Sequence, residues 1–194
     1  MEREVRRKIV HMLLGIVFVL LVYFDVFEGI HFVLLFFIGI IASWLCKNFY
    51  VPFFSPMLEL FERPEEIRTF PGKGAITFVA GCGLSVLLFS KLAALTGIMV
   101  LSIADAASLI VGKFFGRLVH PLNPNKHLEG LIAGFVFGVP AALVFLPTIR
   151  AFIVAAFAAL VETINIRFGS LRIDDNLSVP LATGLITTLL MLVH

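Results

Sequence analysis

Three acidic residues lie where an apolar sequence gives them little reason to be. Asp105, Glu129 and Glu162 fall inside or at the ends of long hydrophobic runs. A carboxylate in hydrocarbon costs at least a few kcal/mol, so such residues usually face protein or water and serve a function. We therefore expect them to be catalytic or metal-binding groups. The alternative is structural ion pairing with nearby cations, namely Lys113, Arg117 or Arg167.

The densest polar stretch of the chain covers residues 103–134. Within it, Asp105, Ser108 and Gly112 follow one another by three and four residues, so on a helix they share one face of small side chains. Such a face either packs closely on another helix or leaves room for a ligand. Since one of its members is an acid, a ligand site is the interpretation we carry forward.

Cations follow this face directly. Lys113 and Arg117 are four residues apart, and the prolines and asparagines of residues 121–125 predict a turn that brings Lys126 beside Glu129. Carboxylates suit a divalent metal, and lysine and arginine suit phosphate groups. The combination is typical of a nucleoside triphosphate site in which Mg²⁺ bridges the phosphates. The chain has no GxxxxGK[ST] motif, which excludes a P-loop enzyme.

Polar residues also occur near the start of the first and the last apolar run. Asp174, Asp175 and Asn176 precede the last run, where one of them is explained as a helix N-cap and the others add oxygen ligands for a metal. His11 follows a basic stretch ending at Lys8 and lies about 4.5 Å further along the same helix. Both a structural hydrogen bond and a contact to substrate are open for His11.

The elements that must position these residues are membrane helices. The 194 residues are 60% hydrophobic and 14% charged, which excludes an ordinary soluble domain. Charged residues divide the chain into seven apolar segments, each close to the length that a bilayer requires: Ile9–Phe24, Gly29–Cys46, Gly74–Ser90, Leu92–Gly112, Gly130–Ile149, Ala151–Ile166 and Leu177–Val193. We predict an all-α, polytopic membrane helix bundle of about seven transmembrane helices, forming a single domain over residues 1–194.

The charges also predict an orientation. If the N-terminus is cytoplasmic, Lys91 and Arg150 are the only two of the 15 Lys and Arg residues on the outer side. Because cations resist translocation, we expect a cytoplasmic N-terminus and an external His194, in a multi-pass protein of the cell membrane. The inner side also holds all the acids except Asp25 and Glu28, which insertion does not require. Chemistry is therefore expected on the cytoplasmic face.

The remaining features are structural expectations. The inner connection over residues 47–73 predicts a short interfacial helix starting near Ser55–Pro56, with an irregular loop as the alternative. Cys46 and Cys82 have no partner at metal-ligand spacing and are interpreted as small core residues. The first apolar run lacks a small-residue cleavage site, so we interpret it as a retained helix.

Four blocks of the sequence resemble the CTP-dependent polyprenol kinases, the family of dolichol kinase, phytol kinase and the yeast-type CTP-dependent diacylglycerol kinase. They are RRKIVHMLLG (Arg6–Gly15), FPGKGAITFVAG (Phe70–Gly81), DAASLIVGKFFGRLVHPLNPNKHLEGLIAG (Asp105–Gly134) and VETINIRFGSLRIDDNLSVP (Val161–Pro180). The third is the specific one, since D-x-A-[SA]-x-x-x-G-[KR]-x-x-G followed by K-x-x-E-G is similar to the family signature. His127 departs from it, because a small hydroxyl residue is expected there.

The resemblance implies transfer of the γ-phosphate of CTP to the hydroxyl of a long-chain isoprenoid alcohol of the dolichol or polyprenol type, with Mg²⁺ as cofactor. It implies a catalytic role for Asp105, Glu129 and Glu162, with Glu162 or Asp105 as the base. Metal ligands are then Asp105, Glu129, Asp174, Asp175 and Asn176. Nucleotide and phosphate contacts are assigned to Lys8, Lys73, Gly112, Lys113, Gly116, Arg117, Lys126 and Gly130. His11 and Ser108 are assigned to the lipid headgroup.

Two rival functions stay open at this level. A CTP-dependent cytidylyltransferase making a CDP-lipid resembles this family, and Arg172–Asp174 is a faint echo of its R-x-D signature. A small-molecule transporter would place polar residues near the midplane on two repeated halves, whereas here they gather at one rim. The partners expected are CTP, the alcohol and membrane lipid, without nucleic acid, and a homo-oligomer is left open.

Overall fold

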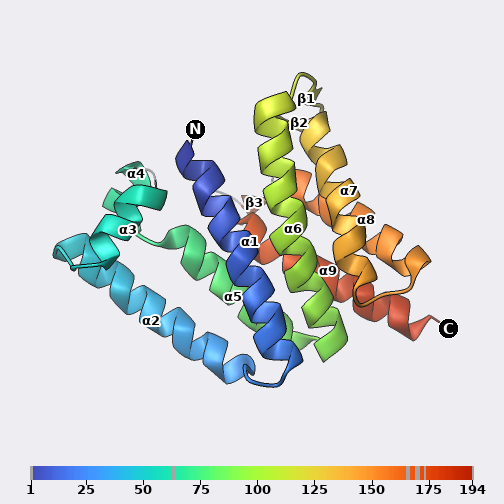
Figure 1. Ribbon diagram of the computed structural model, residues 1–194, viewed down its shortest axis with the longest axis horizontal. Helices are drawn as coiled ribbons and strands as arrows, with labels where there is room; N and C mark the ends of the chain where they lie inside the picture. The colour runs from blue at the N-terminus through green and yellow to red at the C-terminus, as the bar shows by residue number, and fades with distance from the viewer. Residues whose placement is uncertain (1, 63, 165–166, 169–170, 173, 194) are drawn as a thin grey trace.

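The computed structural model describes residues 2–62, 64–164, 167–168, 171–172 and 174–193 and is predominantly helical (Figure 1). Its helices are α1 (Glu2–Tyr23), α2 (Gly29–Asn48), α3 (Phe54–Phe61), α4 (Pro64–Thr69), α5 (Lys73–Leu88), α6 (Lys91–Phe115), α7 (Leu128–Leu143), α8 (Thr148–Thr163) and α9 (Asp175–Leu192). Two antiparallel pairs of short strands interrupt them: β1 (Val119–His120) with β2 (Asn123–His127), and β3 (Arg167–Phe168) with β4 (Leu171–Arg172). The strictly all-α expectation is corrected by these hairpins.

Each of the seven apolar segments coincides with a helix, namely α1, α2 and α5–α9, although Ile166 lies outside the described residues. By length and hydropathy, α2, α6 and α9 are the helices within the described residues that could each cross a membrane, while α5 and α7 are shorter apolar helices. The chain is thus a helical membrane protein. This measure supports three of the seven predicted spans. Helix α1 does not meet it because its first turns are charged, and α8 does not meet it because it has only 16 residues.

Helix α6 forms the centre of the bundle, between α1 and α7 (Figure 1). It also packs on α9, and α8 closes the bundle against α7 and α9. Small and β-branched side chains fill this core, including Ala104, Val154 and Ala158, because close packing of small residues holds helices together in lipid. Helix α2 packs mainly on α5 and diverges from the rest.

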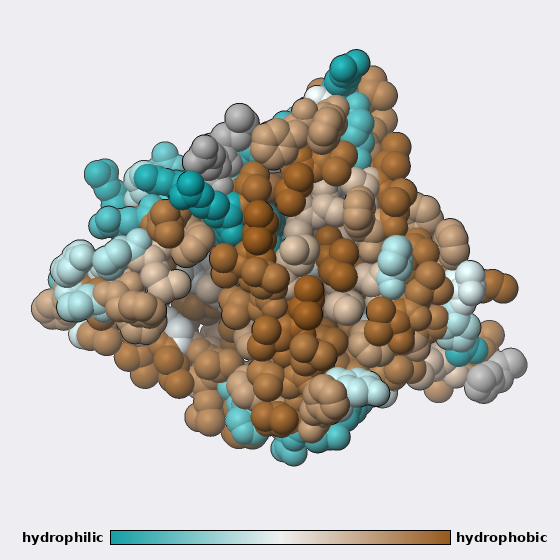
Figure 2. Space-filling model, viewed as in Figure 1, coloured by the Kyte–Doolittle hydropathy of each residue, from teal (hydrophilic) through white to brown (hydrophobic). Residues whose placement is uncertain are grey.

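Apolar side chains cover the middle of the face seen in Figure 2, and polar ones gather at its two ends. At one end lie the N-terminus and the β1–β2 hairpin, and at the other the turn between α1 and α2. Asp25 of that turn forms an ion pair with Lys91, the first residue of α6, with 2.6 Å between Oδ1 and Nζ. This distribution is the one expected of a protein whose middle is surrounded by lipid.

The connection between α2 and α5 contains the short helix predicted near Ser55, as α3, and a second one, α4, that was not foreseen. Met57 and Leu60 of α3 are exposed, in line with an interfacial helix. Glu62 caps α3 and accepts a hydrogen bond of 2.8 Å from the Gly72 N–H. Burial raises the pKa of the Glu62 carboxyl, an effect that this hydrogen bond only partly offsets. Both cysteines are free, and Cys82 is fully buried as expected.

Candidate active site

A cleft of about 430 Å³ lies among α1, α6, β2, α7, α8 and α9. We call it the main cleft. Nine of the residues singled out in the sequence line it, although they come from six separate elements: Lys8, Asp105, Ser108, Gly112, Lys113, Lys126, Gly130, Glu162 and Asp175. The fold therefore brings together the expected carboxylates and cations in one hollow.

Asp105 of α6 forms an ion pair with Lys8 of α1. Their side chains are only 9% and 11% exposed, so each charge depends on the other. The sequence offered Lys113, Arg117 and Arg167 as structural partners for the acids. The structure instead pairs Asp105 with a lysine from the first helix, and Lys113 with Glu4 of that same helix.

Lys126 of β2 connects two further acids. Its Nζ atom lies 3.2 Å from Glu162 Oε1 of α8 and 3.2 Å from Asp175 Oδ2 of α9, and it also donates to the Glu162 carbonyl oxygen. Burial acts to lower the pKa of Lys126, but the carboxylates of Glu162, Asp175 and Asp105 outweigh it and raise this pKa. The ammonium is therefore held charged among three carboxylates.

The wall of the main cleft between α6 and α7 is formed by backbone. A Cβ atom on Gly130 would lie 2.8 Å from the Ser108 carbonyl oxygen, and one on Gly112 would lie 3.4 Å from the Gly130 Cα. At Gly130 the two helices therefore approach to a distance that only glycine permits, while Gly112 faces it at ordinary contact distance. The face of small side chains predicted around Asp105 packs on α7, and the main cleft lies beside this contact. The two interpretations that the sequence left open, helix packing and room for a ligand, therefore both hold.

A second cleft of about 300 Å³ adjoins the first. Arg7, Lys8 and Asp175 line both clefts and so form a shared wall. Four more predicted site residues line the second cleft: His11, Lys73, Asp174 and Asn176. The Asp174 side chain caps α9 by accepting from the Asn176 N–H at 3.0 Å, the capping role expected of one member of this acidic group.

Two buried polar atoms at the second cleft have no hydrogen-bond partner, His11 Nδ1 and Asn176 Oδ1. The residues are 7% and 6% exposed. An unpaired buried polar atom costs free energy, so each of these atoms calls for a partner that the described side chains do not supply, either water or a ligand. Neither atom could be identified from sequence, because hydrogen-bond saturation depends on tertiary neighbours.

Three predicted site residues lie elsewhere, since Glu129, Arg117 and Gly116 line neither cleft. The Glu129 carboxylate accepts hydrogen bonds from the backbone N–H groups of Arg117 and Leu118, at 2.9 and 3.1 Å. Lys126 forms its ion pairs with Glu162 and Asp175 and not with Glu129, beside which it was expected. A Cβ on Gly116 would clash with the His127 ring, which gives that glycine a packing role.

The described residues contain no group of three or more His, Cys, Asp and Glu side chains that could hold a metal by themselves. Mg²⁺ bound with a nucleotide, however, needs only one or two carboxylates, because phosphate and water supply the other oxygens. Glu162 and Asp175, joined through Lys126, and the nearby Asp105 are donors of that kind. The donor set therefore fits a metal that enters with a nucleotide.

Sequence reasoning missed several residues of the clefts. Arg7 lines both clefts and contacts Glu66 of α4 at 3.0 Å, and Asn123 is 1% exposed and donates to the Thr163 carbonyl oxygen. The basic run around Arg7 was a usable signal. The amide of Asn123 carried none, because asparagine in a proline-rich turn is ordinary.

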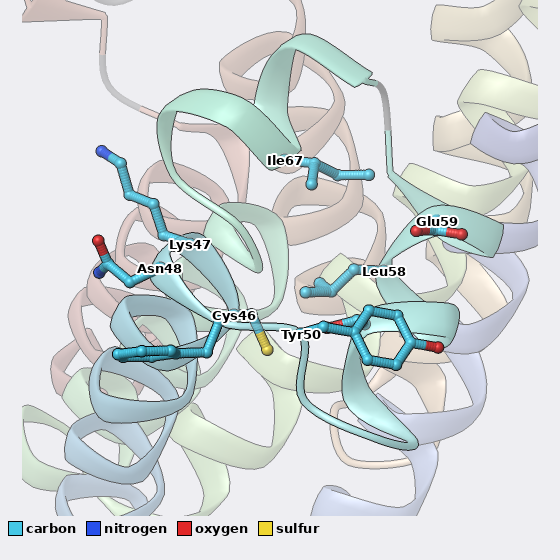
Figure 3. A pocket seen from close by; sticks show the side chains of 9 residues that line it. Cys46, Lys47, Asn48, Tyr50, Leu58, Glu59 and Ile67 are labelled. Atoms are coloured by element: carbon cyan, nitrogen blue, oxygen red, sulfur yellow. The ribbon is translucent and has the colours of Figure 1, made fainter.

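Another cavity, of about 320 Å³, lies at the end of α2 beneath α3 and α4 (Figure 3). Leu58 of α3 and Ile67 of α4 line it, while the Lys47 side chain extends away from them. Lys47 Nζ donates to the Thr69 carbonyl oxygen, which ties α2 to the end of α4. The Lys47 ammonium is thus used in holding this connection together.

Fold and clefts define a helical membrane protein with a charged, two-part cleft. The chain matches no profile of a known protein family and no solved structure. It is 30% identical to an uncharacterized protein of Methanocaldococcus jannaschii over 95% of this chain and 92% of that one. It is 35% identical to the CTP-dependent diacylglycerol kinase 1 of Eremothecium gossypii over 44% of this chain, and 26% identical to a probable chloroplastic phytol kinase 2 of Oryza sativa subsp. japonica over 97%.

The chain belongs to one family with the Methanocaldococcus jannaschii protein, and its homologues include CTP-dependent diacylglycerol kinases and a probable phytol kinase, which supports a place among the CTP-dependent lipid kinases. It spans about a quarter of the length of the fungal enzyme and 66% of the plant one. The resemblance noted from the four sequence blocks is thereby confirmed. The R-x-D echo of a cytidylyltransferase includes Ile173, which lies outside the described residues.

Proposed function

We propose that this protein is a CTP-dependent lipid kinase that transfers the γ-phosphate of CTP to the hydroxyl of a long-chain isoprenoid alcohol, giving a polyprenyl phosphate and CDP. The observation that carries the proposal is the main cleft, where Lys8 and Lys126 lie among Asp105, Glu162 and Asp175. Phosphoryl transfer needs cations for the phosphates and carboxylates for metal and proton. The CTP donor and the lipid acceptor are supported by the relatives, and the isoprenoid class by the family resemblance.

In this proposal Lys8, Lys113 and Lys126 bind phosphate oxygens in the main cleft. Their present partners are carboxylates, so an arriving triphosphate would exchange one set of anionic oxygens for another. Asp105 and Asp175 would hold Mg²⁺, which when bound neutralises charge on the phosphates. Glu162 or Asp105 would accept the proton of the hydroxyl. Catalysis would then consist mainly of positioning and charge stabilisation.

We further propose that seven helices cross the membrane and that the clefts open to the cytoplasm, the side that the distribution of Lys and Arg residues favours for Lys126 and its loop. Single cysteines test this in a chain whose Cys46 and Cys82 are replaced by alanine. Asn125→Cys should react with an impermeant thiol reagent only from inside, and Lys91→Cys and Arg150→Cys only from outside. Labelling of Asn125→Cys in intact cells would contradict the orientation.

The direct test supplies the purified full chain with CTP labelled at the γ-phosphate and with candidate alcohols in detergent. Label should appear in the lipid together with CDP, CTP should exceed ATP as donor, and chelation of Mg²⁺ should stop the reaction. Pyrophosphate with a CDP-lipid would identify a cytidylyltransferase instead. As a matched pair, Lys126→Met should abolish activity, whereas Lys47→Met, at a lysine outside both clefts, should not.

A further inference from the structure

We propose that the second cleft binds the acceptor hydroxyl, held by Asn176 Oδ1 and His11 Nδ1. This deepens the proposed function and rests on it. It gives Asn176 a role toward the alcohol in place of the metal role expected from sequence, and it assigns nucleotide and acceptor to separate, adjoining clefts.

The orientation of the Asn176 amide supplies the first step. Its Nδ2 donates to the Gly74 carbonyl oxygen at 3.2 Å and to Thr77 Oγ1 at 3.3 Å, so both amide hydrogens have partners. Its Oδ1 has none and is buried at the cleft. An amide oxygen is an acceptor, so the group missing from this position is a hydrogen-bond donor.

His11 supplies the second atom. Its ring stacks on Phe78 at 4.9 Å with an interplanar angle of 7°, which fixes the plane in which Nδ1 points. A Cβ on Gly74 would lie 3.7 Å from His11 Cε1, the carbon bonded to Nδ1. Since the Gly74 carbonyl oxygen also accepts from Asn176 Nδ2, the two side chains that carry the unpartnered atoms both adjoin Gly74.

A hydroxyl satisfies this pair, because it donates one hydrogen and accepts through its oxygen. It would donate to Asn176 Oδ1 and accept from the His11 N–H. An amino-substituted nucleobase offers a similar pair of groups, but bases also pack their faces on apolar or aromatic surfaces. Among the described residues that line this cleft, His11 alone carries a ring, and a face of that ring is covered by Phe78.

The position of the cleft fits the chemistry. Arg7, Lys8 and Asp175 separate it from the main cleft, so a hydroxyl at Asn176 would adjoin a γ-phosphate held by Lys8. In the transfer, the hydroxyl oxygen forms a bond to the γ-phosphorus while the bond from that phosphorus to the β–γ bridging oxygen breaks. CDP leaves with that oxygen. The hydroxyl proton passes to one of the carboxylates proposed as the base in the adjoining main cleft, Glu162 or Asp105.

An apolar groove nearby would accept the hydrocarbon chain of such an alcohol. It has about 270 Å³ and lies between α2 and α5, lined by Phe32, Val79 and Gly83 among others. Val79 is five residues beyond Gly74 on α5, or about 7.5 Å along the helix. A nucleotide would make no use of this groove, whereas a long-chain alcohol held at Asn176 would reach it.

The test uses two substitutions of His11 in the full chain, assayed with CTP and with geranylgeraniol or dioctanoylglycerol as acceptor. His11→Phe keeps the ring on Phe78 and removes Nδ1, so the KM for the accepted alcohol should rise about tenfold, as for the loss of one hydrogen bond. The KM for CTP should stay within about twofold of its original value, a much smaller change than the loss of a hydrogen bond would cause. His11→Asn places an amide near Nδ1 and should recover most of the loss.

A second variant avoids the buried ring altogether. Gly74→Ala adds a methyl group beside His11 at ordinary contact distances, and alanine favours the helix, so folding should be retained. It should raise the KM for the alcohol by crowding the hydroxyl. Gly138→Ala is the control, because its Cβ meets Ala104 and Ala155 at 3.4 Å and Gly138 lines neither cleft.

Each result decides between alternatives. A raised KM for CTP with a changed preference for CTP over UTP would make the second cleft a base site and overturn the inference. Unchanged KM values in both His11→Phe and Gly74→Ala would overturn it alone, with the kinase activity intact. If the unaltered protein phosphorylates neither alcohol with CTP, the proposed function fails and the inference with it.

Discussion

Helices α6 and α2 are both long and apolar, yet they have opposite surroundings. In the most hydrophobic part of α6, 67% of the residues are buried within the protein, against 11% in α2. Mean hydropathy is similar, at 2.0 and 2.3. The difference lies in side-chain size and polarity, because α6 carries Ser102, Asp105 and Ser108 among alanines, while α2 presents Phe37, Ile41 and Trp44 outward. In lipid, apolarity alone does not drive burial, and small or polar residues determine which helix is central.

The largest effect on the difference between the two helices is expected from removing the charge of Asp105 in α6. Asp105→Asn should lower turnover at least a hundredfold, because it deletes an anionic group from the main cleft. It should also destabilise the fold by about 3–5 kcal/mol, since Lys8 loses its buried partner. Turnover and thermal unfolding measured on the same preparation would give both effects.

A double variant separates the two effects of Asp105. Lys8→Met with Asp105→Leu removes both charges, so stability should return while activity stays absent. Recovery of turnover along with stability would show that the pair is scaffold and would end the metal assignment of Asp105.

A smaller effect is expected from truncating apolar side chains on the two helices. Leu101→Ala in α6 removes a side chain that is 1% exposed and should cost about 2–5 kcal/mol in unfolding free energy. Ile41→Ala in α2, at 58% exposure, should stay within about 0.5 kcal/mol, because lipid or detergent fills the space. Equal losses at the two positions would mean that α2 has a protein partner in the membrane.

The smallest effect concerns Glu62, in the connection that joins α2 to α5. Burial raises its pKa above the ordinary value of about 4.3, so folding favours the protonated form. This contribution to stability is complete below about pH 4 and is lost as the pH rises through the raised pKa. Glu62→Gln still accepts from Gly72 and carries no charge, so its melting temperature relative to the unaltered chain should increase from pH 4 to pH 7. The exposed Glu59→Gln should show no such trend.

The helices could be predicted because charged residues bound the apolar runs. The bounds were less accurate: α1 begins at Glu2, before the predicted Ile9, because a helix continues past the membrane surface when its polar side chains reach water. Helix α4 and the β1–β2 hairpin were not foreseen, since their sequences are short and proline-rich. Membrane helices are predicted from the length and hydropathy of apolar runs, and neither property is informative in such short connections.

The sequence allowed the residues of the site to be predicted, but not which of them contact one another. Lys8 and Asp105 are separated by 97 positions, and Lys126 and Asp175 by 49, so no local spacing reveals either contact. Glu129 shows the converse. Its position next to Lys126 suggested a shared site, but the backbone N–H groups at the end of α6 are a nearer partner for its carboxylate.

The crossing of α6 and α7 at Gly112 and Gly130 bears on how selective the main cleft is. A wall made of side chains can change shape by rotating them, but main chain has no rotamers. A ligand lying against these two glycines meets a contour that is set before it arrives, so fitting it there costs no side-chain entropy. A ligand too wide for this point could be accommodated only if two packed helices moved apart.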